Sequence, residues 1–406
     1  MNTKIEIVDK GTVTTPDGFQ AGAVFAGINK KAKAGLDMGI IFSTAPCNTA
    51  GVFTKNHIKA APVLLSQERL KLGKAAAIVA NSGCANACTG EQGTANAGEI
   101  SKLVALNLGI PEEDVLVAST GVIGQPMPME LIRPSIPLIK VSREGGHNFA
   151  LAIMTTDTTE KEIAVRVTAG KNNFYIGGAA KGAGMIHPDM ATMLGFLTTD
   201  AEVDLEFLRE SLQKAVDVSF NMISVDGDTS TNDTVLLMAN GQAENDPITK
   251  DDYEYAKVFQ DALNQVCVYL AKAIARDGEG ATRLIEVAVN GAPSEADAKQ
   301  VARTVVSSPL VKTAVYGNDP NWGRVIAAVG RSGVAVEEKK ISIFLGNICV
   351  FKSGQPQNFN LQKAAAALNK TEVPIEIRLN SGEGEATAWG CDLTEKYIKI
   401  NAEYTT

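Results

Sequence analysis

The stretch Lys181–Leu194, KGAGMIHPDMATML, decides both the fold and the chemistry that this chain can carry. Two glycines follow the lysine, a turn is predicted at His187–Asp189, and Thr192 opens an apolar run to Leu197 that predicts a buried strand. If the chain is cut before Thr192, that strand begins with a hydroxyl and a free α-amine on one residue. A residue of that kind can act as nucleophile and general base together.

Composition and charge narrow the classes of protein. The chain has 406 residues, enough for two domains or one large one, with 45% hydrophobic and 21% charged residues. A net charge of −8 without a basic block argues against nucleic acid as a partner. The N-terminal stretch lacks the apolar core of a signal peptide, and no run approaches membrane-spanning length. We therefore expect a cytoplasmic protein without a membrane partner.

Metal-binding residues are few. The chain has three histidines and six cysteines, and among the cysteines only Cys84 and Cys88 are close in sequence. Reduced thiols explain this pattern better than a zinc site does, so we expect no metal.

The first half of the chain is predicted to form short strands separated by glycines. Strands are predicted at 36–42, 75–80, 115–118, 150–156, 163–167 and 173–176, and a helix at 94–108. Two of the strands run into small-residue turns, Asn81–Gly83 and Ser119–Gly121. Backbone N–H groups at such strand ends are a common source of oxyanion holes.

After Thr192 the pattern becomes helical twice. Apolar residues repeat with helical spacing at Leu205, Leu208, Leu212 and Val216, and again at Phe259, Leu263, Val266, Leu270 and Ile274. The second helix ends at the loop Asp277–Gly280, which places Glu279 between two glycines. That glutamate is either a ligand-binding residue or an exposed turn residue. Residues Ser294–Asp297 resemble a capping box, and we place a domain boundary between residues 282 and 295.

Nucleophilic chemistry at Thr192 needs a base. There is no G-x-S-x-G elbow, and no histidine is marked as a partner by its neighbours in sequence. A free α-amine has a pKa of roughly 7.7–8.0 and would serve as that base. It would arise if the Thr192 hydroxyl attacked the carbonyl of Ala191 and water opened the resulting ester. From the residues alone, self-cleavage and an ordinary buried hairpin both stay open.

Eight segments, spread along the whole chain, resemble the ornithine acetyltransferase family, also called glutamate N-acetyltransferase. They are ANSGCANACTG at 80–90, STGVIG at 119–124, MTTDT at 154–158, KGAGMIHPDMATML at 181–194, SVDGDTSTND at 224–233, DGEGAT at 277–282, GNDPNWGR at 317–324 and NAEYTT at 401–406. So many long segments in one order make chance similarity very improbable.

The resemblance implies an αββα sandwich of the DmpA type with a smaller C-terminal α/β domain from about residue 290. It implies cleavage between Ala191 and Thr192 into an α chain, 1–191, and a β chain, 192–406, which form an α2β2 heterotetramer. Thr192 matches the nucleophile, and Thr120 with Gly121 matches the oxyanion hole. The substrate-binding positions are Thr155, Lys181, Thr192, Glu279, Asn401 and Thr406.

The implied reaction moves the acetyl group of N2-acetyl-L-ornithine to L-glutamate through an acetyl-threonine, in cyclic arginine biosynthesis. Lys181 and Thr155 would hold the substrate carboxylate, and Glu279 the δ-ammonium. No cofactor is expected, and whether acetyl-CoA serves as a second acetyl donor stays open. One alternative is an N-terminal-nucleophile aminopeptidase or amidase of the DmpA type, with water as the acceptor. The other is a non-catalytic chain kept for binding or assembly.

Overall fold

The computed structural model describes residues 3–32, 35–170, 172–187 and 193–403. One long strand, β3 (Met38–Phe53), organises the larger part of the molecule. Its first half pairs with β2 and β4 and its second half with β10, and the register shifts between Phe42 and Cys47. Since β3 belongs to both groups of strands, it divides the nine-stranded sheet into two layers.

The two layers have different strands. The first layer contains β1 (Thr3–Val8), β6 (Lys161–Ala169), β7 (Asn172–Lys181), β8 (Leu194–Thr199) and β10 (Thr234–Ala239), in that order across the sheet. The second layer contains β2 (Phe19–Val24), β4 (Lys74–Asn81) and β5 (Val115–Ser119).

The layers pack face to face. One cluster of buried side chains draws Ile78 and Leu116 from the second layer and Phe196 and Leu236 from the first. Phe149, at the side of this cluster, meets Phe196 edge to face with ring centroids 5.2 Å apart. The interior of the sandwich is therefore a shared apolar core.

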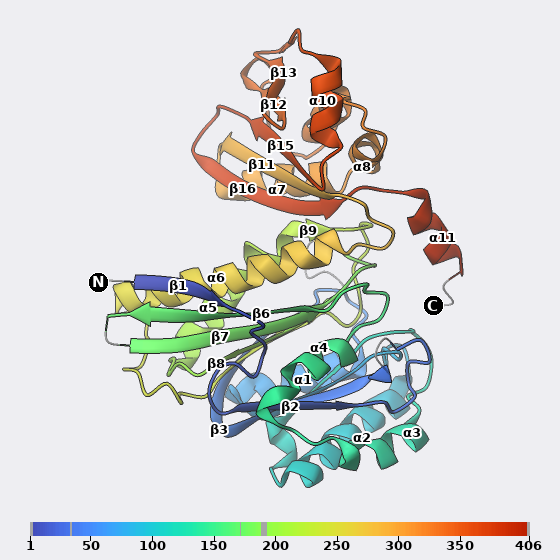
Figure 1. Cartoon of the computed structure of the whole chain (residues 1–406), viewed down its shortest axis with the longest axis vertical. Coiled ribbons are helices and arrows are strands. Elements are labelled where there is room, and N and C mark those ends of the chain that lie inside the picture. The colour runs from blue at the N-terminus through green and yellow to red at the C-terminus, as the bar shows by residue number, and fades with distance from the viewer. Residues whose placement is uncertain (1–2, 33–34, 171, 188–192, 404–406) are drawn as a thin grey trace.

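Helices cover both outer faces (Figure 1). On the first layer lie α5 (Leu205–Asp217) and α6 (Tyr253–Arg276), which bury the apolar stripes that the sequence predicted. On the second layer lie α2 (Gly90–Leu108) and α3 (Met129–Ser135), with α1 (Ala61–Arg69) beside β5. The order helix, sheet, sheet, helix confirms the αββα sandwich.

One predicted strand, 150–156, is wrong. The residues begin inside a helix, α4 (Gly146–Ala152), and continue into a loop. Phe149, Ala150 and Ile153 are buried together at helical spacing, so a period of 3.6 describes them better than a period of two.

A second sheet forms the smaller C-terminal domain. Its order is β14 (Gln355–Pro356), β13 (Ile348–Lys352), β12 (Ser342–Leu345), β15 (Glu372–Arg378), β11 (Leu284–Ala292), β16 (Gly384–Cys391) and β9 (Ile223–Ser224). The helices of this domain are α7 (Glu295–Val306), α8 (Pro309–Tyr316), α9 (Trp322–Gly330) and α10 (Leu361–Leu368). The predicted cap of α7 is present, since Asp297 N donates to Ser294 Oγ at 3.1 Å.

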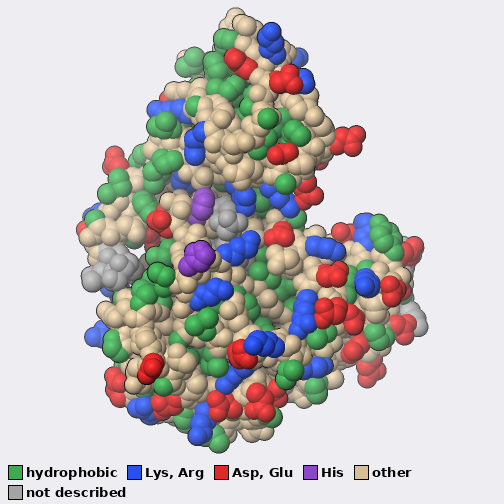
Figure 2. All heavy atoms as spheres, turned by 180° about the vertical axis from the view of Figure 1, so that it is seen from behind, with side chains coloured by type: hydrophobic (Ala, Val, Ile, Leu, Met, Phe, Trp, Pro, Cys, Tyr) green, Lys and Arg blue, Asp and Glu red, His purple; other side chains and the backbone are tan. Residues whose placement is uncertain are grey.

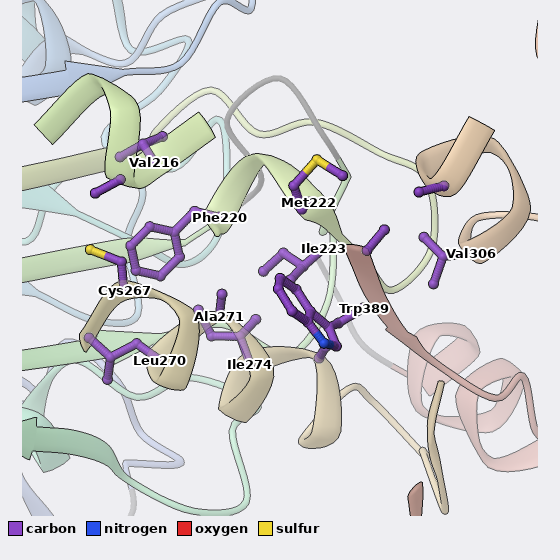
Figure 3. Packing of buried hydrophobic residues seen from close by; sticks show 14 of the residues in the cluster. Val216, Phe220, Met222, Ile223, Cys267, Leu270, Ala271, Ile274, Val306 and Trp389 are labelled. Atoms are coloured by element: carbon purple, nitrogen blue, oxygen red, sulfur yellow. The ribbon is translucent and has the colours of Figure 1, made fainter. Parts of the chain in front are cut away.

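The two parts of the molecule share a core. Strand β9 lies between α5 and β10 in the chain, both of which belong to the sandwich, but it pairs with β16 of the second sheet. Figure 3 shows Trp389 of β16 beside Ile223 of β9 and Ile274 of α6. The Trp389 indole donates its hydrogen bond to Glu286 Oε2 at 2.8 Å, so its polar edge is satisfied.

The last helix, α11 (Glu395–Glu403), leaves β16 and projects beside the sandwich (Figure 1). Short 3₁₀ turns occur at Leu70–Leu72, Glu112–Asp114, Ile136–Leu138, Arg143–Gly145, Phe220–Met222 and Glu338–Lys340. On the face shown in Figure 2, acidic and basic side chains are interspersed. Within the described residues, no helix has both the length and the apolar character that a bilayer crossing requires.

Candidate active site

One pocket of about 90 Å³ gathers residues from distant parts of the chain. Six residues predicted from the sequence line it: Thr120, Gly121, Thr155, Lys181, Glu279 and Asn401. The predicted nucleophile Thr192, its neighbour Ala191 and the terminal Thr406 lie outside the described residues.

The strand register explains why the pocket forms here. Strand β7 ends at Lys181, which pairs with Leu194 at the start of β8. On the other side Leu194 pairs with Thr234 at the start of β10. Lys181 and Asp233 therefore stand on either side of the chain that leads into β8.

The turn at Thr120 and Gly121 is held close to another backbone. Thr120 N donates to Asn81 O at 3.0 Å, and Gly121 has a φ of +133°. A Cβ on Gly121 would lie 2.3 Å from the carbonyl carbon of Gly83, so only glycine fits. Among the described residues the Gly121 N–H meets no hydrogen-bond acceptor, and this leaves it available to a ligand in the pocket.

The Thr120 hydroxyl is also available as a donor. Its oxygen accepts a hydrogen bond from Lys181 Nζ at 3.3 Å, which leaves the hydroxyl hydrogen for another acceptor. A hydroxyl and an N–H on two residues that line one pocket are the kind of donors from which oxyanion holes are built.

Asn232 fixes this turn and was not found from the sequence. Its side chain is 4% exposed, and Nδ2 donates to Ser119 O at 2.8 Å and to Ala85 O at 2.6 Å. Its own side-chain oxygen accepts from Thr231 Oγ1 at 2.6 Å. A buried amide with these partners sets the position of the residue just before Thr120.

Lys181 is 3% exposed, and burial lowers its pKa below the ordinary value while Asp157 acts in the opposite direction. Asp157 connects the surrounding loops through the hydrogen bonds that it accepts. Its carboxylate accepts from Thr155 N at 3.0 Å, from Gly182 N at 2.7 Å and from Lys161 Nζ at 2.7 Å. Burial alone would raise the pKa of Asp157, but Lys161 and Lys181 hold it below its usual value.

The loop of Glu279 joins the same network. Lys161 Nζ also donates to Asp277 at 2.6 Å, and Glu279 N donates to Ala183 O at 2.8 Å. A Cβ on Gly184 would lie 2.5 Å from the Glu279 carboxyl carbon, so a larger residue at position 184 would displace the carboxylate. The partly exposed carboxylate faces the pocket, where it can meet a cation.

Helix α11 completes the wall, although none of its residues is buried. Asn401 Nδ2 donates to Glu279 Oε2 at 2.8 Å, and Tyr397 Oη donates to Asp226 Oδ2 at 3.2 Å. Asp226 in turn accepts from Met185 N at 2.6 Å and from Ile186 N at 2.9 Å. Two polar contacts therefore connect this helix to the loops around the pocket.

The other groups weighed from the sequence lie elsewhere. His147 Nδ1 contacts Glu162 at 2.7 Å, and His187 Nδ1 lies 3.3 Å from Ser224 Oγ. All six cysteines are free, with Cys84 buried. Within the part of the chain that the structure describes, no group of three or more His, Cys, Asp or Glu could hold a metal ion.

Removing the Asp157 charge should destabilise the protein. In Asp157→Asn the buried Lys161 loses one of its two carboxylate partners, and breaking a buried pair typically costs about 3–5 kcal/mol. Because the pKa of Asp157 is lowered on folding, this stabilisation is complete above roughly pH 3.9 and is lost as pH falls through the folded value. Melting temperatures at neutral and acid pH measure both effects.

The matched control for that variant is Asp261→Asn, which removes an exposed carboxylate paired with Lys257 within α6. It should leave the melting temperature nearly unchanged. Equal losses in the two variants would contradict the importance of the buried pair.

Comparisons with known proteins agree with the motifs. A family model described as the ArgJ family matches residues 20–406. A relative from Dehalococcoides mccartyi, named arginine biosynthesis bifunctional protein ArgJ, is 54% identical and covers 100% of both chains. One of the same name from Bacillus subtilis is 49% identical and covers 98% of this chain and 97% of its own. A crystal structure of the protein of that name from Bacillus halodurans is 48% identical and covers 51% of this chain and 97% of its own, with a TM-score of 0.49.

Proposed function

The chain belongs to the ArgJ family, and we propose that it transfers the acetyl group of N2-acetyl-L-ornithine to L-glutamate in arginine biosynthesis. The family confirms the resemblance drawn from the eight segments. One structural observation carries the proposal to particular residues: Thr120, Gly121, Thr155, Lys181, Glu279 and Asn401, separated by up to 281 positions, line a single pocket.

The first half of the reaction acetylates Thr192. Its α-amine takes the hydroxyl proton while Oγ bonds to the acetyl carbonyl carbon. The Thr120 hydroxyl and the Gly121 N–H stabilise the tetrahedral oxyanion. The bond between that carbon and the substrate nitrogen then breaks, the Thr192 ammonium returns the proton to the nitrogen, and ornithine leaves.

The second half reverses these steps with a new acceptor. The α-amine of glutamate attacks the acetyl-threonine carbonyl, the ester bond breaks, and N-acetyl-L-glutamate leaves with the acetyl group. Lys181 and the Thr155 hydroxyl hold the α-carboxylate that both substrates share. Only ornithine carries a δ-ammonium, and the Glu279 carboxylate, which lines the pocket, would receive it.

Before this cycle the chain cuts itself between Ala191 and Thr192. The products, residues 1–191 and 192–406, stay together as an α2β2 heterotetramer in the cytoplasm. No cofactor takes part. The relatives' name calls them bifunctional, and our candidate for a second activity of this chain is acetylation of glutamate from acetyl-CoA.

Two measurements test this function. A denaturing gel with N-terminal sequencing should give two chains, one of which begins Thr-Met-Leu-Gly. With labelled N2-acetyl-L-ornithine, label should pass to glutamate much faster than to water. Release of labelled acetate as the main product would instead favour an aminopeptidase or amidase of the DmpA type, and an uncut, inactive chain would favour a non-catalytic role.

Glu279→Gln should discriminate between the two half-reactions. The variant loses a charge-assisted contact worth about 1.5–3 kcal/mol, so KM for N2-acetyl-L-ornithine should rise about 10- to 100-fold. KM for glutamate should change much less, because glutamate brings no cation to this position. Steady-state kinetics with each substrate varied in turn measures the difference.

Glu91→Gln on the exposed start of α2 is a suitable control and should behave as wild type. An equal rise of KM for both substrates in Glu279→Gln would contradict the assignment of Glu279 to the ammonium.

A further inference from the structure

Asp233 is a buried carboxyl that the proposed transfer reaction does not use. It directly precedes β10 and is 1% exposed. Its Oδ1 accepts a hydrogen bond from Met193 N at 3.1 Å. Within the described part of the chain its Oδ2 has no hydrogen-bond partner, and the nearby Thr54 hydroxyl donates to Ser230 O at 2.8 Å. Burying a carboxyl oxygen without a hydrogen-bond partner costs free energy, so the position of Asp233 needs an explanation.

The position of Asp233 relates it to the cleavage site. Met193 directly follows Thr192, so the N–H that Asp233 accepts belongs to the peptide group joining those two residues. Three covalent bonds, each of about 1.3–1.5 Å, connect this nitrogen to the nitrogen of Thr192. Lys181 lies on the opposite side of the same segment, at the paired end of β7.

Before it is cut, the chain needs a side chain that can accept a proton and return it. Before the cut, the Thr192 nitrogen is part of an amide and cannot act as a base. The described side chains of His147 and His187 contact Glu162 and Ser224 instead. Asp233 is the carboxyl hydrogen-bonded next to the reacting residue.

We propose that Asp233 carries the proton in the self-cleavage between Ala191 and Thr192. The inference rests on the proposed function, which includes that cut. As Thr192 Oγ bonds to the Ala191 carbonyl carbon, the Asp233 carboxylate takes the hydroxyl proton. As the C–N bond breaks, the protonated carboxyl gives the proton to the Thr192 nitrogen.

The proton balance closes with one carboxyl group. The shift converts an amide and a hydroxyl into an ester and an amine, so no proton is gained or lost. Water then adds to the ester and its C–O bond breaks. One proton of the water restores the Thr192 hydroxyl and the other leaves to solvent, so the Ala191 carboxyl ends as a carboxylate. Since the donor and the acceptor of the proton belong to the same residue, the carboxyl need not travel between them.

The electrostatics suit this task. Burial raises the pKa of Asp233 well above its ordinary value, while the Met193 N–H and the Lys181 ammonium act in the opposite direction. Lys181 is the charged group facing Asp233 from β7, and beyond it stand Asp157 and Glu279. An acid–base group transfers protons best when its pKa lies near the working pH.

The test follows cleavage of the full chain made by cell-free translation, sampled on denaturing gels and by intact mass. Asp233→Asn keeps the shape of the side chain and an oxygen for Met193 N but loses the ionisable group. It should be cut about 10²- to 10⁴-fold more slowly than wild type. In Asp233→Ala, added formate should restore cleavage in proportion to its concentration, because a small carboxylate can occupy the vacated space.

Asp200→Asn is the matched control. Asp200 is also buried, accepts Tyr175 N at 2.7 Å and Asp17 N at 3.0 Å, and follows β8 at its other end. This variant should be cut at the wild-type rate even if its melting temperature falls.

The possible outcomes distinguish a failure of the role of Asp233 from a failure of the proposed function. If wild type itself stays uncut, the proposed self-cleavage fails whatever Asp233 does. If wild type is cut and Asp233→Asn is cut equally fast, the role of Asp233 is wrong and the proposed function stands. If Asp233→Asn is both uncut and misfolded, formate decides: rescue of Asp233→Ala supports the proton transfer, and no rescue overturns it.

Discussion

Thr192→Ala is expected to remain one chain of 406 residues and to transfer no acetyl group. The variant lacks the hydroxyl that attacks the Ala191 carbonyl, and without the cut it also lacks the α-amine that serves as base. Both functions are lost together, so the decrease in kcat should be on the order of 10⁶-fold, as when a hydrolase loses its nucleophile. Gels, intact mass and the transfer assay measure the two losses.

Thr192→Ser keeps a hydroxyl and, once cut, an amine. It should cleave more slowly than wild type and retain transfer activity. A Thr192→Ala protein that is cut at residue 191, or an uncut wild type that transfers acetyl, would contradict the use of the Thr192 amine as base.

Gly121→Ala is the second large expected effect. The added Cβ would lie 2.3 Å from the Gly83 carbonyl carbon at a φ of +133°, so the turn must move. The Gly121 N–H and the neighbouring Thr120 hydroxyl would then leave their positions in the pocket. Loss of one oxyanion-hole donor lowers kcat by about 10²–10³-fold.

Gly98→Ala, on α2, is the control because a Cβ there meets no atom within 4 Å. It should keep full activity. Wild-type kcat in Gly121→Ala would show that this turn does not form the oxyanion hole.

Local patterns predicted the elements but not how they meet. The stripes of α5 and α6 were visible because burial on one helix face leaves a period of 3.6 in the sequence. Residues 150–156 were misread because a short apolar run fits a helix or a strand equally well. The αββα arrangement came from the family resemblance, since β3 pairs with strands of both layers and shifts register between them, which no local pattern encodes.

The same limit explains which site residues were missed. Glu279 stood out because glycines flank it in a loop. The turn at Thr120 stood out because it ends a strand and contains Gly121, and the family resemblance assigned Thr120 its role. Asn232 and Asp233 did not, because their partners are far away in sequence: Asn232 binds Ser119 O, 113 positions away, and Asp233 binds Met193 N, 40 positions away. Such contacts depend on strand register, which the sequence does not show directly.

The strand order of the first layer has a consequence for the product of the proposed cut. Strands β8 and β10 come from residues after the cut, while β7 on one side and β3 on the other come from residues before it. The two product chains would therefore be interleaved within one sheet and held by backbone hydrogen bonds along both borders. Neither product chain could dissociate without disrupting the core of the other. The cut would therefore create a new N-terminus while both chains stay bound.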